Sequence, residues 1–192
     1  LGISFMDAMH GAEKEIENGR NFVTKLWNAS RFVLMNAPGV PIGSVDLAVV
    51  ATQGSLFDRW IAGAYAATAQ AVTVALDEYR VNEALTALYH FFWHEFCDWY
   101  IEIAKPVVQG KEGEARRDQV RGLFIEILHG VLRLAHPFVP HASEAIYQEL
   151  SGHGASIMVA EWPRPVVPAG REAGTAVQEI KDVVYALRNI RG

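Results

Sequence analysis

Between its glycines and prolines, the chain repeats its hydrophobic residues mostly every three or four positions, the period of an α-helix. Residues 1–11 lack a clear period, residues 44–54 are ambiguous, and residues 157–160 are predicted to form a short strand or extended segment. The pattern predicts helices over residues 13–36, 55–77, 81–104, 114–134, 140–150 and 172–190. We therefore expect an all-α fold, an up-and-down bundle of about five helices over residues 1–150. Residues 151–192 are expected to be a C-terminal extension, with an extended segment, a linker and one further helix.

Two of the expected helices carry further signals. Ser55 and Asp58 stand three residues apart at a helix start, which is the spacing of a near capping box. The helix over 81–104 is so aromatic that we expect it to form the centre of the core, ending before Pro106. Its apolar stripe is predicted to be Leu85, Leu88, Phe92, Phe96, Trp99 and Ile103, widened by Tyr89, Trp93 and Tyr100.

The first helix has an unusual polar face opposite its apolar one. The apolar face is predicted to be Phe22, Leu26, Ala29, Val33 and Leu34. Lys25, Asn28 and Arg31 follow one another at three-residue steps, and Trp27 and Phe32 flank this polar row. Cations and amides beside aromatic rings are suited to unpaired nucleotides, because they bind phosphates, base edges and base faces respectively. The alternative is that both rings are core and the polar groups an ordinary solvated face.

Composition limits the class of protein. The chain is 51% hydrophobic and 20% charged, as expected for one soluble globular domain. Its net charge of −5 argues against a general nucleic-acid binder, so RNA would have to bind through a local patch. We expect no membrane span and no secretory signal, and the single cysteine, Cys97, fits a reducing cytoplasm. Because residue 1 is leucine, we expect a part of a longer protein.

The candidate catalytic and metal-binding residues do not form a convincing site. His90, His94 and Asp98 share a helical face, but a zinc motif of this type needs a second histidine in place of Asp98. We predict that these residues are paired polar groups at the edge of the core. His136 and His141 are separated by two prolines, which favours a turn between helices. We expect no catalytic, cofactor or metal site, and therefore a binding module.

Four phrases of the sequence are similar to valyl-tRNA synthetases, in that family's order. They are Lys25-Leu-Trp-Asn-Ala-Ser-Arg-Phe32, Phe91-Phe-Trp-His-Glu-Phe-Cys-Asp-Trp-Tyr100, Leu132-Arg-Leu-Ala-His-Pro-Phe-Val-Pro140 and Ser156-Ile-Met-Val-Ala-Glu-Trp-Pro163. The resembling region is the helical anticodon-binding domain that follows the family's catalytic core. The His-Pro-Phe turn is shared with isoleucyl and leucyl relatives, whereas the first two phrases are more specific. The family's ATP-binding signatures are absent from this sequence.

The resemblance implies a part of a valine–tRNA ligase, the enzyme that attaches valine to its tRNA using ATP and magnesium. This chain would not catalyse that reaction and would hold neither cofactor. Its partners would be the valine isoacceptor tRNA and the catalytic domain of the same polypeptide, in the cytoplasm. The family's tRNA contacts map onto Lys25, Trp27, Asn28, Arg31 and Phe32, although the Trp27 ring has an alternative inward placement. The competing hypothesis is a stand-alone helical protein-interaction module.

Overall fold

The computed structural model describes residues 5–164 and 171–191, which form helices, connecting turns and an isolated bridge between Pro41 and Ser151. Eight α-helices lie in this part of the chain: α1 (Phe5–Asn36), α2 (Leu47–Gln53), α3 (Leu56–Asp77), α4 (Val81–His90), α5 (Ile101–Val108), α6 (Glu114–Ala135), α7 (Pro140–Tyr147) and α8 (Arg171–Arg191). A π-helix, η1 (Phe91–Tyr100), joins α4 to α5, and a short 3₁₀-helix, η2 (Ile157–Val159), follows α7. The all-α prediction is confirmed.

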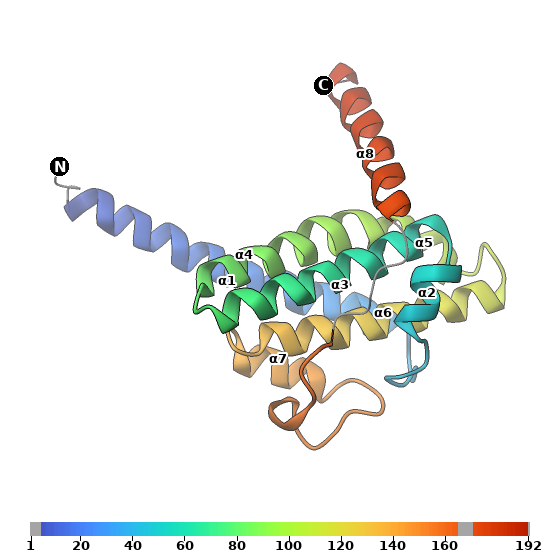
Figure 1. Ribbon diagram of the computed structural model, residues 1–192, viewed down its shortest axis with the longest axis horizontal. Coiled ribbons are helices and arrows are strands. Elements are labelled where there is room, and N and C mark those ends of the chain that lie inside the picture. Colours follow the sequence, from blue (N-terminus) through green and yellow to red (C-terminus); the bar gives the residue numbers. More distant parts are fainter. Residues whose placement is uncertain (1–4, 165–170, 192) are drawn as a thin grey trace.

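The long helices lie side by side, with α7 packed beneath α6 and α1 (Figure 1). The N-terminal part of α1 and the C-terminal part of α8 project from the bundle in different directions (Figure 1). At the centre, the Phe124 ring of α6 meets the Phe96 and Tyr100 rings of η1, with centroids 6.1 and 5.8 Å apart. Helices α3 and α6 approach closely at Gly130, where a Cβ atom would lie 2.0 Å from the Tyr65 hydroxyl oxygen.

The π-helix moves the buried stripe of the third predicted helix by one residue. Leu85, Trp99 and Ile103 were predicted on the central stripe, but Leu85 is exposed and the other two are only partly buried. Tyr100, predicted at the edge of the stripe, and Ala104 are buried instead. The reason is that i→i+5 hydrogen bonding places more residues in each turn, which rotates every later side chain. Pro106 does not end the helix before it, because the Gln109 amide still donates to the Lys105 carbonyl at 3.1 Å.

Three other boundaries differ from the prediction. Helix α1 already begins at Phe5, and the ambiguous stretch contains α2. The strand or extended segment predicted over 157–160 is wrong, because η2 occupies it. There the Glu144 carboxylate accepts hydrogen bonds from the Ser156 hydroxyl and the Ile157 amide, both at 3.0 Å, and these local bonds replace strand pairing. The capping box of Ser55 and Asp58 is confirmed.

Helix α8 packs on the bundle through its N-terminal half. Ala173, Val177 and Lys181 are buried against α3 and its neighbours, whereas Leu187 and Ile190 of the C-terminal half are exposed. The segment before α8 is also joined to α3, since the Trp162 indole N–H donates to the Thr73 hydroxyl at 2.8 Å. A division of the chain near residue 150 stays a prediction.

Candidate nucleic-acid interface

The C-terminal half of α1 is a local basic segment in an acidic chain. Residues 19–36 contain three basic residues, Arg20, Lys25 and Arg31, and no acidic residue, although the whole chain carries −5. Because this stretch is one continuous helix, its cations are held on a rigid scaffold. This is the kind of local patch that an acidic protein needs in order to bind an anion such as RNA.

The five residues predicted to bind tRNA lie on one outward arc of α1. At about 100° per residue, the order around the helix is Trp27, Arg31, Asn28, Phe32, Lys25, and the arc covers about 160°. The middle of the arc is open to solvent, since Asn28 and Arg31 are both exposed. Arg31 forms no ion pair with any residue that the structure describes, so its charge is available to a ligand.

On one side of this arc, Lys25 and Phe32 are engaged with other helices. The Lys25 ammonium lies 3.1 Å from Asp98 Oδ1 and 4.7 Å from the centre of the Trp93 ring. The Phe32 ring is half-buried, and its centroid lies 6.2 Å from that of Phe124. The Asp98 carboxylate therefore partly neutralises the Lys25 ammonium, and only part of the Phe32 ring is accessible to a ligand.

On the other side of the arc, the Trp27 ring faces solvent. It is 52% exposed, so the alternative in which it turns inward and leaves Phe32 outside is wrong for this structure. The reason lies in the neighbouring helices. Phe32 points towards the aromatic centre of α6, whereas Trp27 lies over the short α7, next to a groove.

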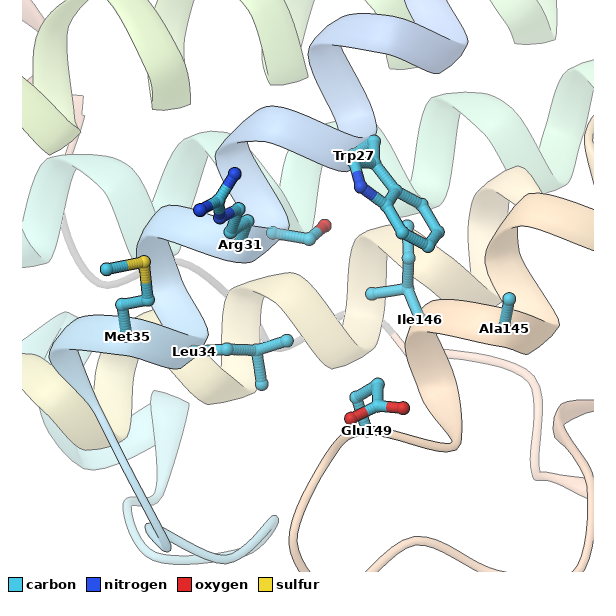
Figure 2. A pocket seen from close by; sticks show the side chains of 8 residues that line it. Trp27, Arg31, Leu34, Met35, Ala145, Ile146 and Glu149 are labelled. Atoms are coloured by element: carbon cyan, nitrogen blue, oxygen red, sulfur yellow. The ribbon is translucent and has the colours of Figure 1, made fainter.

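Figure 2 shows this groove, which runs between α1 and α7 and has a volume of about 650 Å³. Trp27 lies above Ile146 in this view, while Leu34 and Met35 lie towards the other end. Ser30 is 1% exposed, and its buried hydroxyl has no hydrogen-bond partner in the described part of the chain. The residues that line the groove are Trp27, Ser30, Arg31, Leu34, Met35, Ala145, Ile146 and Glu149.

Two cations near the arc were not predicted. Arg20 is exposed and lies seven residues before Trp27, nearly two helical turns, so the helical period already placed it on the same side. Lys105 of α5 lies with its ammonium 5.8 Å from the centre of the Phe32 ring. No local sequence signal joins residues 73 positions apart, and Lys105 is revealed only by the fold, which places its ammonium near the Phe32 ring.

The catalytic and metal-binding candidates have structural partners. His94 Nδ1 lies 3.3 Å from Asp98 Oδ2, and Asp98 also pairs with Lys25. Among the described residues, no three His, Cys, Asp or Glu side chains are grouped so as to hold a metal ion. Burial raises the pKa of the Cys97 thiol to about 12, which keeps it protonated and unreactive. His136 lies in the predicted turn, where its Nδ1 is 2.9 Å from the Ser143 hydroxyl.

A comparison with known families identifies the fold. A model described as the anticodon-binding domain of tRNA ligase matches residues 58–192. The chain belongs to this family. The matched part of this anticodon-binding domain begins within α3, so α1 and the arc lie before it.

Individual relatives extend the similarity over nearly the whole anticodon-binding domain. A valine–tRNA ligase of Geobacter sulfurreducens is 43% identical over 184 residues, which are 94% of this chain. Valine–tRNA ligases of Listeria monocytogenes and Bacillus licheniformis are each 40% identical over 179 residues, or 93% of the chain. The chain spans only 20% of the length of each relative. In the described part of the anticodon-binding domain, no helix is long and apolar enough to cross a membrane.

Proposed function

We propose that this domain binds the anticodon stem-loop of a valine tRNA through the outer face of α1, as a part of a valine–tRNA ligase. The observation that carries the proposal is the acid-free segment 19–36, where the exposed Trp27 and the unpaired Arg31 stand side by side. An anticodon offers unstacked bases and a phosphate backbone, which suit an aromatic ring and a guanidinium group.

The remaining residues of the arc would add to this surface. Asn28 has an amide that can both donate to and accept from a base edge. Lys25 would exchange part of its contact with Asp98 for a phosphate, and Lys105 would place a further positive charge beside the Phe32 ring. If the protein contacts about three phosphates, the affinity for the loop should decrease as salt is added. A plot of the logarithm of the association constant against the logarithm of the salt concentration should have a slope of about −2.

A mobility-shift titration tests the proposal. We expect the chain to retard a valine isoacceptor tRNA weakly at low salt and to bind an unrelated tRNA less well, because only a few base contacts discriminate between them. The same experiment, repeated at increasing salt, should give the shallow slope stated above. Equal retardation of both tRNAs, or none, would favour the competing hypothesis of a helical protein-interaction module.

Catalysis belongs in this proposal to the parent enzyme. The catalytic domain of the same polypeptide would bind ATP, magnesium and valine, and the present domain would orient the tRNA in the cytoplasm. No residue of this chain is assigned to either cofactor. The function of the domain would then be to couple recognition of the anticodon to the distant charging reaction.

Arg31→Ala, introduced into a full-length valine–tRNA ligase with this domain, should lower the efficiency of tRNA charging by about tenfold. The reason is the loss of a charge-assisted hydrogen bond to the RNA. Valine-dependent ATP–pyrophosphate exchange should remain nearly unchanged, because it does not require the anticodon. Arg164→Ala removes an exposed arginine near α3 and serves as the control. An equal loss of both activities with Arg31→Ala would point to a structural role instead.

A further inference from the structure

The groove between α1 and α7 contains a polar group that the fold itself does not satisfy. Ser30 is almost completely buried, yet its hydroxyl has no hydrogen-bond partner in the described residues and lies in the wall of the groove. Buried hydroxyl groups are normally paired, because an unpaired one costs free energy. A ligand that enters the groove and offers a hydrogen bond would remove this cost.

The walls of the groove match the chemistry of a nucleobase. The half-exposed Trp27 ring offers a flat face for stacking, Ile146 lies next to it, and Leu34 lines the groove further along (Figure 2). Arg31 and Glu149 also line the groove, and neither forms an ion pair with a residue in the described part of the chain, so a donor and an acceptor are available to a base edge. The volume of about 650 Å³ is within the range of small-ligand sites.

We propose that this groove is a pocket for a single unstacked base of the RNA bound along α1. The base stacks on Trp27, its polar edge meets the Ser30 hydroxyl, and its sugar–phosphate backbone stays on the outer arc near Arg31. The proposal rests on the proposed function, because a base reaches the groove only as part of a bound strand. It adds a second recognition surface to that function, on the α7 side of the helix.

Three variants separate this role from a structural one. Trp27→Ala removes the stacking face and should weaken binding of an anticodon stem-loop hairpin by about 5- to 150-fold. Ser30→Ala removes only the unpaired hydroxyl, so it should leave thermal unfolding unchanged or raise the midpoint while weakening RNA binding several-fold. Trp27→Phe keeps an aromatic face and should retain most of the affinity.

The pocket also predicts coupling between the protein and one nucleotide. The hairpin is synthesised with an abasic site at each loop position in turn, and each version is titrated against the wild type and Trp27→Ala. At one loop position, removing the base should lower the affinity of the wild-type protein for the hairpin. The same removal should not lower the affinity of Trp27→Ala any further, because that variant already lacks the stacking contact with this base.

The outcomes distinguish the two proposals. If Trp27→Ala weakens binding of the hairpin but Ser30→Ala binds it as well as the wild type does, Trp27 acts on the open arc, so the pocket is wrong and the proposed function stands. If every abasic position is additive with Trp27→Ala, the pocket is also wrong. If the wild type binds neither the hairpin nor the tRNA, the proposed function fails and the pocket fails with it.

Discussion

Asp58→Ala is expected to lower the free energy of unfolding by about 3–5 kcal/mol, the cost of removing one partner of a buried ion pair. Asp58 is fully buried at the start of α3, and its carboxylate lies 2.7 Å from the Arg116 guanidinium of α6. It also accepts a hydrogen bond from the Tyr100 hydroxyl at 2.8 Å. Burial raises the pKa of Tyr100 well above its usual value, so the phenol remains a donor. The substitution leaves the buried Tyr100 hydroxyl without its acceptor and removes the nearest carboxylate from Arg116, which keeps only its contacts with Gln119, Ser55 and the more distant Glu112.

Urea unfolding followed by far-ultraviolet circular dichroism measures this effect. Asp46→Ala is the matched control, because it removes an exposed aspartate that caps the start of α2, which should cost only about 1 kcal/mol. If Asp58→Ala costs no more than the control, Asp58 acts as a helix cap and not as the junction between α3, η1 and α6.

Lys181→Ala is expected to release α8 from the bundle, with a local cost of about 3–5 kcal/mol. The Lys181 ammonium is buried, pairs with Glu95, and lies 4.4 Å and 5.5 Å from the ring centres of Trp60 and Trp99. A desolvated cation over an aromatic face contributes about 2 kcal/mol or more. Its loss removes that contact and leaves the Glu95 carboxylate partly buried without its partner.

Amide hydrogen exchange reports this release directly. Protection should fall throughout α8 while α3 and α6 keep theirs, because these two helices pack in the core without α8. Lys111→Ala, in the exposed loop before α6, removes a lysine of the same charge and should change neither pattern. Unchanged protection of α8 in Lys181→Ala would mean that Ala173, Val177 and the contact between Tyr185 and Trp99 hold the helix in place without the lysine.

The positions of the long helices along the chain could be predicted from the sequence, but which side chains of each helix face the core could not. The spacing of hydrophobic residues and the presence of capping residues are local signals, so the long helices and the capping box at Ser55 were predicted. The π-helix has no comparable signal, and it moved Tyr100 from the predicted edge of the apolar stripe to the core while Trp99 moved to the edge. The arc on α1 was predicted, but which aromatic ring faces solvent depends on α6 and α7. For the same reason Lys105 and the groove around Ser30 were missed.

The buried contact at Lys181 fixes one point of α8, so a small rotation of the helix at that point moves its projecting C-terminal end by a larger distance. The helix is buried up to Lys181, and the following rise of about 15 Å to Arg191 is held only by Tyr185 and Arg188, which both contact the Trp99 ring. A tilt of about 10° at the anchor would therefore displace the far end by about 3 Å. The two tryptophans and Glu95 set the direction in which α8 leaves the bundle, and so the position of its tip relative to the outer face of α1.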